Sequence, residues 1–414
     1  MSETSEQPIE ADNDTSSMST NKGNEEPVSG ISSSLRGRTG EWIDFPAAAD
    51  NSEQSRGANE RDEVRNELLR ALSSDSFIVL SGLGTSLGIP SLQQRKAPTM
   101  RDLWKKVSAL PDFQSVAEGV PGSLLKTENI EHFLSHIQAQ LSLQEDEALK
   151  VFLGQAQDVI LDACSFVSTD SDLDIHQLFL RKIGRRSARL QRTKLFTTNY
   201  DLAFEEAAGR ARFQLIDGFG LSSRREFDGG LFDLDFVRRG PHDRLILEGN
   251  VLHLLKLHGS VDWDRTASST RRIDGKAINP VLIYPSANKY QLSFRQPYLE
   301  MMSRFQMALR VPDISLLVVG FGFNDEHIVA PIEAAIRSNV GLRLIVVDPG
   351  IRVESKRSAT MQWLERLAHD GDHRITLLEG RFDDLVRLMP DASEFDERQA
   401  HADRISRLDE PRTT

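Results

Sequence analysis

The chain has 414 residues, enough for one large domain with an insertion or for two domains with sizeable cores. Its formal net charge of -12 is concentrated at the ends: residues 1–60 carry twelve acidic and four basic side chains, and residues 391–414 carry seven acidic and four basic ones. The middle of the chain is therefore almost neutral, which excludes neither an anionic ligand nor a nucleic-acid partner.

The only cysteine, Cys164, excludes a disulfide within one chain and a metal site built from several cysteines. Apolar runs stay shorter than the roughly 18 residues that span a bilayer. The first residues lack the basic and apolar regions of a secretory signal. We therefore expect a soluble, cytoplasmic protein without membrane contact.

Residues 1–60 are rich in Ser, Glu, Asn, Gly and Thr and show no sustained apolar period, so we predict a disordered acidic tail. We expect the folded domain over residues 61–390 and a polar C-terminal tail over 391–414. The domain begins with a helical pattern at 63–72 and a buried strand at 77–80.

The next stretch is mainly helical, with patterns at 100–107, 129–137, 143–167 and 174–181. It is too long for one crossover connection, so we predict a helical insertion subdomain over about 92–190. Strands then return at 195–198, 254–257, 281–284, 315–320, 342–347 and 375–378, mostly separated by helices at 202–211, 297–309, 326–338, 356–369 and 381–389. This alternation predicts an α/β fold with a doubly wound, mostly parallel, Rossmann-like sheet.

Polar or glycine-rich segments follow four of the predicted strands, at the edge where open parallel sheets bind ligands. In chain order they read SGLGTS (81–86), TTNYD (197–201), KLHGS (256–260) and GFGFNDEH (320–327), and Asp348 ends a later strand. Glycines let the backbone turn sharply and approach a ligand, and exposed backbone N–H groups at such turns bind phosphates.

Each of these residues also has a plain structural explanation. Asn199 or Asp201 could cap the helix at 202–211, and Asn324 or Asp325 the helix at 326–338. A lone histidine such as His258 is more often a satisfied side chain at a strand end, and Asp348 could close a turn before Pro349. The occurrence of all four segments on successive strand ends is harder to explain by capping and predicts a shared site.

Together, GLGTS…GIP, TTNYD, KLHGS and VVGFGFND resemble the sirtuin-like NAD-binding domain over about residues 77–348. They are most similar to the sirtuin-like NAD hydrolases of bacterial antiphage defence, and within these to the subunit that pairs with a HerA-type ATPase. The resemblance implies NAD as substrate, a hexameric HerA-type ATPase as partner, a large homo-oligomeric ring and DNA contact through the complex. Cys164 alone cannot hold the structural zinc of sirtuin deacylases, so no structural zinc is expected.

Nicotinamide leaves NAD as a neutral molecule, so a site that cleaves this bond does not need the carboxylate pair of O-glycosidases. The amide of Asn199 can hold a ribose hydroxyl and a water, because it both donates and accepts. His258 can accept a proton near neutral pH. With the resemblance, these properties predict Asn199 and His258 as the catalytic pair of an NAD⁺ glycohydrolase.

We predict cofactor contacts from the same strand ends. Backbone N–H groups of Gly82, Gly84 and Thr85 would bind the pyrophosphate, Asp201 would orient the catalytic residues and Asp348 would bind the adenosine ribose. The other predicted cofactor-binding residues are Ser86, Gly320, Phe321, Asn324 and Asp325. His132 and His136 lie one helical turn apart but have no third ligand in view, so no metal-binding residues are predicted.

Two other functions stay open. An NAD-dependent protein deacylase would use the same fold, and a non-catalytic scaffold that senses NAD or ADP-ribose would regulate a partner ATPase or nuclease. A basic run at 181–194 could contact nucleic acid or an acidic partner, although a solvated helix end is the simpler explanation.

Overall fold

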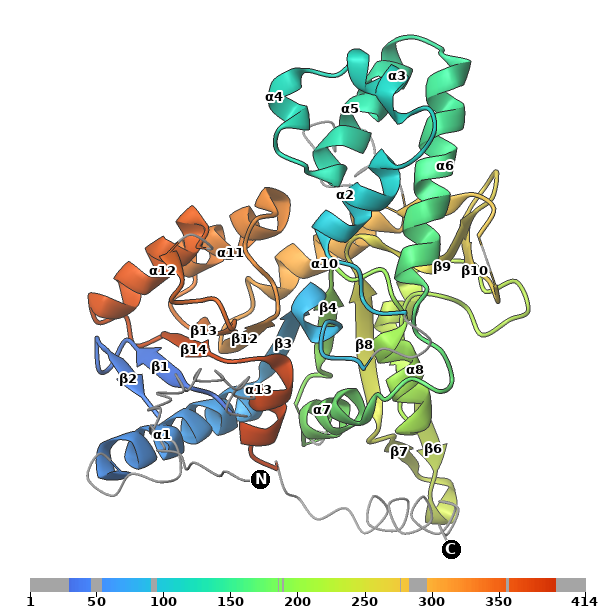
Figure 1. Cartoon of the computed structure of the whole chain (residues 1–414). Helices are drawn as coiled ribbons and strands as arrows, with labels where there is room; N and C mark the ends of the chain where they lie inside the picture. Colours follow the sequence, from blue (N-terminus) through green and yellow to red (C-terminus); the bar gives the residue numbers. More distant parts are fainter. Residues whose placement is uncertain are drawn as a thin grey trace, which may run out of the picture.

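The computed structural model describes residues 30–45, 54–90, 95–184, 186–187, 190–275, 277–282, 296–354 and 357–391. Over these ranges nine strands form one sheet (Figure 1). In spatial order they are β2 (Trp42–Asp44), β1 (Ser33–Arg36), β14 (Ile375–Glu379), β13 (Arg343–Val347), β12 (Ile314–Val319), β3 (Ser76–Ser81), β4 (Lys194–Thr197), β8 (Val251–Lys256) and β5 (Gln214–Ile216). Neighbours from β14 to β5 run parallel, which confirms the predicted α/β fold with a mostly parallel sheet.

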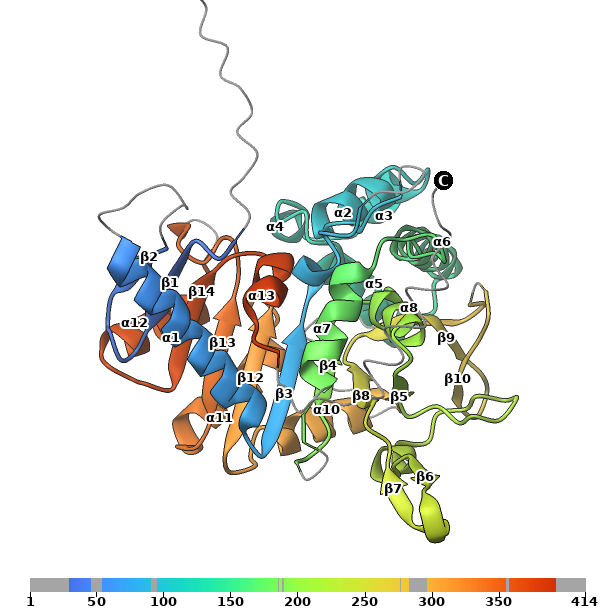
Figure 2. The same cartoon turned by 90° about the horizontal axis from the view of Figure 1, so that it is seen from below.

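The two faces of the sheet are buried by separate groups of helices, because apolar side chains of alternate parity point to opposite faces. Ile78 and Leu80 of β3 belong to one core, and Phe77 and Val79 to the other. The first core is covered by α10 (Tyr298–Ala308), α11 (Glu326–Ser338) and α12 (Ala359–His369). The second is covered by α1 (Gln54–Ser73), α7 (Asp174–Gly184), α8 (Ala203–Arg210) and α13 (Phe382–Leu388), as Figure 2 shows from below.

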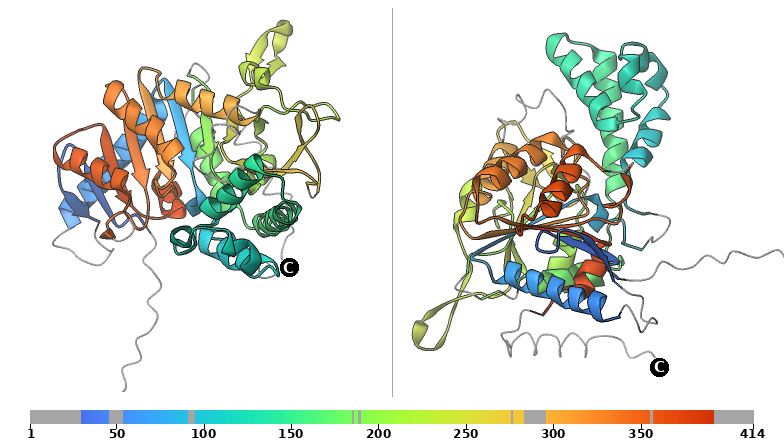
Figure 3. Two further views of the ribbon diagram at one scale, coloured as in Figure 1. Left: turned by 90° about the horizontal axis from the view of Figure 1, so that it is seen from above. Right: turned by 90° about the vertical axis from the view of Figure 1, so that its left-hand side faces the viewer.

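The helical insertion has a core of its own. It consists of α2 (Met100–Ser108), α3 (Phe113–Glu118), α4 (Gly122–Leu125), α5 (Ile130–Leu143) and α6 (Glu147–Cys164). Four aromatic rings at its centre, Trp104, Phe113, Phe133 and Phe152, contact one another with centroids 5.2–6.4 Å apart. The group projects from the carboxyl edge of the sheet (Figure 3). In contrast to the predicted insertion boundary, α7 packs against α8 and α13 on the sheet.

Two short antiparallel sheets complete the described chain. One consists of β9 (Gly259–Arg265), β10 (Thr270–Arg272) and β11 (Pro280–Leu282), and the other of β6 (Val237–Arg239) and β7 (Leu245–Leu247). The strand predicted at 281–284 was expected in the main sheet, but its described part pairs with β9. Residues 283 and 284 lie outside the described residues. None of the helices in the described ranges combines the length and the apolar character that crossing a membrane requires.

The predicted disordered tail is wrong for part of residues 1–60. Strand β1 pairs antiparallel with β14 and covers an otherwise open sheet edge, and β2 extends it. The buried guanidinium of Arg36 forms an ion pair with Glu60 at 2.6 Å, which ties β1 to α1. The remaining parts of both predicted tails, residues 1–29, 46–53 and 392–414, lie outside the described residues.

The described members of the basic run at 181–194 mostly make internal contacts. Lys182 is buried and donates to the carbonyl oxygen of Met389, Arg186 donates to the carbonyl oxygens of Leu72 and Gln191, and Arg192 pairs with Asp235. These three side chains are therefore engaged in contacts within the chain.

The loops that follow β3 and β12 touch each other backbone to backbone. Gly84 donates from its N–H to the carbonyl oxygen of Gly320 at 2.9 Å. A Cβ atom on Gly84 would lie 2.5 Å from Cα of Gly320, which itself has a φ of +64°. The glycines at these positions are therefore required by the contact between two strand-end loops.

We predict that Gly84→Ala lowers the free energy of unfolding by about 1–3 kcal/mol, because the new methyl group overpacks this backbone contact. Gly88→Ala is the matched control, since a Cβ there meets no atom within 4 Å. Chemical denaturation of both variants measures the difference. Equal midpoints for the two variants would contradict the assignment of a structural role to Gly84.

A second prediction concerns His176, which α7 buries against Phe204 and Phe382. Burial lowers the pKa of His176 from 6.5 to about 4. The unfolded chain then binds more protons than the folded one between these values, so stability is full above pH 6.5 and is lost as the pH falls toward 4. We expect this group to account for roughly 3 kcal/mol of acid destabilisation at most.

Unfolding free energies of the wild type, His176→Gln and His132→Gln between pH 7 and pH 4 test this expectation. The pH dependence should flatten in His176→Gln. His132→Gln is the matched control, because it replaces a solvent-exposed histidine. An unchanged slope in His176→Gln would refute the proposed role of this histidine.

Candidate functional site

The carboxyl ends of β12, β3, β4 and β8 lie side by side and carry the four segments singled out in the sequence. A cavity of about 1830 Å³ opens at this edge. Seven of the predicted site residues, which stand in the segments after these strands, line the cavity: Asn199, Asp201, His258, Gly320, Phe321, Asn324 and Asp325. The order of the strands therefore brings together residues that are far apart in the sequence.

The side-chain nitrogen of Asn199 contacts the loop that follows β3, residues 82–86, which we call the glycine loop. Nδ2 lies 3.1 Å from the carbonyl oxygen of Gly82, 3.1 Å from Oγ1 of Thr85 and 2.9 Å from Oγ of Ser86. A carbonyl oxygen can only accept, so the amide nitrogen must face this loop. The donor capacity of Asn199 is thus used within the protein, and Oδ1 remains as its acceptor for a ligand in the cavity.

The glycine loop supports this residue from behind. Gly82, Gly84, Thr85 and Ser86 are not among the lining residues, whereas Leu83 is. Oγ of Ser86 donates to Oδ2 of Asp201 at 2.8 Å, and Oδ1 of Asp201 accepts from the backbone N–H of Ala203 at 3.0 Å. Direct contact of the glycine loop with a pyrophosphate stays a prediction. The hydrogen bonds of Ser86 and Asp201 fix the position of the loop that holds Asn199.

Lys256 also fixes the segment around Asn199, although the sequence analysis did not single it out. Its ammonium group is buried, donates to the carbonyl oxygen of Asp201 and pairs with Oε1 of Glu205 at 2.9 Å. Burial raises the pKa of Glu205, and the nearby Lys256 charge opposes that effect. In the sequence the residue appears only as the first position of the KLHGS segment, two residues before His258.

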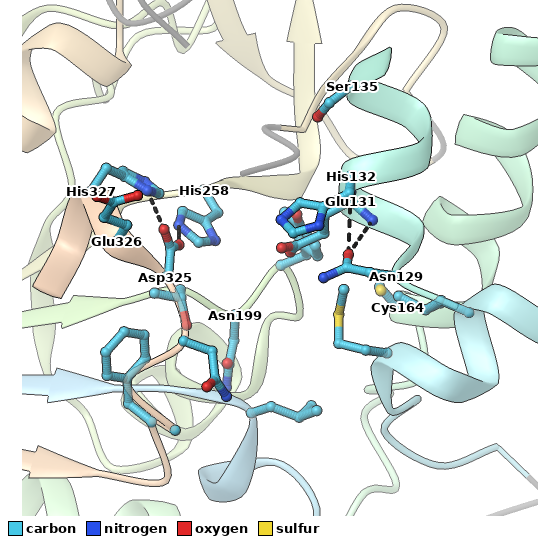
Figure 4. A pocket seen from close by; sticks show the side chains of 18 of the residues that line it. Asn129, Glu131, His132, Ser135, Cys164, Asn199, His258, Asp325, Glu326 and His327 are labelled. Carbon is cyan, nitrogen blue, oxygen red and sulfur yellow. Dashed lines mark hydrogen bonds and ion pairs between the residues drawn. The ribbon is translucent and has the colours of Figure 1, made fainter. Parts of the chain in front are cut away.

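His258 faces a carboxylate from the loop after β12. Its Nε2 lies 2.8 Å from Oδ2 of Asp325, and Oδ1 of Asp325 pairs with Nδ1 of His327. The two imidazole rings stack with centroids 5.2 Å apart at an interplanar angle of 22°. Figure 4 shows the three side chains together on one wall of the cavity.

Asp325 occupies the N-cap position of α11, but its side chain forms no capping hydrogen bond. Such a bond contributes about 1 kcal/mol in other helices. Contacts with the two histidines take its place, so tertiary contacts and not helix capping determine where this carboxylate lies. Burial alone would raise the pKa of Asp325, but the contacts with His258 and His327 outweigh it and hold this pKa well below its usual range. The carboxylate is therefore anionic beside His258 at neutral pH.

The opposite wall of the cavity belongs to the helical insertion. Its α5 presents Asn129, Glu131, His132, Ser135 and His136, several of which are labelled in Figure 4. The side chain of Asn129 caps α5, accepting from the backbone N–H groups of Glu131 and His132. The only sequence signal for this wall is the helical spacing of His132 and His136.

Asp348 lies apart from these residues. It follows β13, and its Oδ1 accepts from the backbone N–H of Gly350 at 2.7 Å, which closes the turn at Pro349. It is not among the residues that line the cavity. The local turn considered in the sequence analysis is thus formed, and the predicted contact of Asp348 with an adenosine ribose stays a prediction.

A family model described as a SIR2-like domain matches residues 193–368. A solved structure of a Sir2 homologue in complex with NAD is 13% identical and covers 82% of this chain and 94% of that one, with a TM-score of 0.38. A structure solved for the mechanism and regulation of Sir2 enzymes is 12% identical and covers 84% of this chain and 99% of that one, with a TM-score of 0.34.

No curated protein matches the sequence. The family match begins just before β4 and ends within α12, so it contains the segments that supply Asn199, His258 and Asp325. Residues 193–368 are thus similar to a SIR2-like domain.

Proposed function

We propose that this protein is an NAD⁺ glycohydrolase that cleaves the bond between nicotinamide and ribose and releases nicotinamide and ADP-ribose. One observation carries the proposal: Asn199 and the His258–Asp325 pair line the same cavity at the carboxyl edge of a parallel sheet. The SIR2-like match over residues 193–368 and the motif resemblance are consistent with NAD as the substrate.

The reaction does not need an acid to protonate the leaving group. When the bond between C1′ and the nicotinamide nitrogen breaks, its electron pair stays on that nitrogen, and the leaving group is neutral. The enzyme has to hold the ribose, stabilise the electron-poor C1′ and deprotonate the water that attacks it. A neutral hydrogen-bond acceptor and one general base meet these needs, and the carboxylate pair of O-glycosidases is not required.

The side chains at the site divide these tasks. Oδ1 of Asn199 accepts from a ribose hydroxyl or from the attacking water and so fixes its orientation. His258 takes the proton of the water as the new bond to C1′ forms. Asp325 holds the imidazole of His258 and stabilises its positive charge once it is protonated, so Asp325 is a positioning residue.

We also propose the biological setting that the resemblance implies. The enzyme would deplete NAD during phage infection, act in the cytoplasm, and assemble as a large homo-oligomeric ring with a HerA-type hexameric ATPase that contacts DNA. The helical group α2–α6, which projects from the sheet, offers a surface for such assembly (Figure 1). Sizing of the purified chain with and without that ATPase tests the partnership, and two independent peaks would refute it.

We expect Asn199→Ala and His258→Ala each to lower the rate of nicotinamide release by about 10²–10⁴-fold, because each removes a group that acts on the reacting atoms. Chromatography of NAD incubations, with and without the ATPase, measures the rate. His369→Ala is the control, since His369 lies outside the cavity and contacts the backbone of Gly40.

Three outcomes would contradict this function. NAD binding without nicotinamide release by the wild type would favour the sensing scaffold. Release that depends on an acylated peptide would favour the deacylase. Undiminished release in both variants would remove Asn199 and His258 from the mechanism.

For Asp325→Asn we expect kcat to fall by about 10–100-fold with little change in NAD binding, because the base loses its anionic partner while the cavity keeps its shape. The acid limb of the kcat/KM profile should move to lower pH for the same reason. A purely structural role would reduce the folded fraction and leave the pH profile of the remaining activity unchanged.

A further inference from the structure

Three potential metal ligands converge on the wall of the cavity that carries His258. One nitrogen atom of His258, one of His327 and a carboxylate oxygen of Asp325 all lie within 4.8 Å of one another. The side chains are 6%, 11% and 23% exposed for His258, Asp325 and His327, respectively. The group is thus mostly shielded from solvent but open to the cavity on one side.

This donor set suits a particular class of ion. Imidazole nitrogens favour zinc and its first-row neighbours, whereas Mg²⁺ and Ca²⁺ prefer a shell made of oxygen ligands. Two histidines and one carboxylate leave at least one coordination position for water or another ligand. The adjoining cavity provides room for that ligand and a path for the ion.

The backbone aims the three ligands toward one another before any ion binds. Phe323 adopts a left-handed conformation with φ 54°, which turns the chain just before Asp325. His327 sits in the first turn of α11, and its ring stacks on that of His258. The carboxylate of Asp325 contacts one nitrogen atom of each ring and forms no capping hydrogen bond with α11.

We propose that a divalent transition-metal ion of the zinc class binds through Nε2 of His258, Nδ1 of His327 and the carboxylate of Asp325, and that it inhibits NAD hydrolysis. A metal ion on Nε2 leaves the proton of the neutral imidazole on Nδ1, so His258 can no longer accept the proton of water. Metal binding itself stands on the convergence of the ligands, while inhibition rests on the proposed hydrolase function.

Binding is measured first, independently of activity. Chelator-treated protein is titrated with Co²⁺, whose visible absorption reports its ligands, and with Zn²⁺ by calorimetry. We expect one equivalent per chain for both ions and no binding of Mg²⁺. His327→Ala removes one of the three ligands and should weaken binding by at least about tenfold, a loss that even a residue orienting a ligand causes at other metal sites.

The double variant His132→Ala/His136→Ala is the matched control, because these two histidines lie across the same cavity. Its binding should equal that of the wild type. The proposal is overturned if neither Co²⁺ nor Zn²⁺ binds, or if the ions bind equally well to His327→Ala. Loss of binding in the double variant alone would move the site to α5 and also overturn it.

The activity arm compares wild type and His327→Ala with and without Zn²⁺. Zinc should slow nicotinamide release by the wild type and leave His327→Ala nearly unaffected. Metal-independent or zinc-stimulated release would refute inhibition. If no preparation releases nicotinamide, the hydrolase proposal and its inhibition both fall, but stoichiometric binding lost in His327→Ala would still support the metal site.

Discussion

The site depends on a backbone contact between the loops that follow the neighbouring strands β3 and β12. Because Gly84 and Gly320 lack side chains, these loops meet closely enough for a direct hydrogen bond. The first loop then holds the amide of Asn199, and the second continues into Asp325 and α11. The close approach of the two glycines thereby sets the distance between Asn199, which follows β4, and the carboxylate of Asp325, which faces His258.

Much of this architecture could be predicted from the sequence. Short runs of apolar, β-branched residues separated by amphipathic helices specify buried parallel strands, and the segments at their carboxyl ends must share one edge. Strand β1, which lies between the edge strand β2 and β14, could not be found this way. It is short and serine-rich, and it pairs with β14 at the far end of the described chain, so neither its composition nor its periodicity reveals the partner.

The candidate site shows the same division between local and tertiary signals. Local rules offered a turn as the alternative explanation of Asp348 and a helix cap as one explanation of Asp325. Asp325 does occupy the cap position, but its side chain serves His258 and His327 instead. Since these histidines come from a different strand end and from the helix itself, only the folded chain identifies what the carboxylate does.

The structure also narrows the chemistry available to Asn199. An isolated amide both donates and accepts, but three acceptors in the glycine loop engage its nitrogen, which leaves an acceptor toward the cavity. A ligand must therefore bring its own hydroxyl or water to this point. The remaining demand, a group that removes a proton, falls to His258, whose Nε2 faces Asp325. The same imidazole that serves as the base also offers Nε2 to a metal ion. Because a metal ion on Nε2 leaves the ring proton on Nδ1, catalysis and metal binding exclude each other.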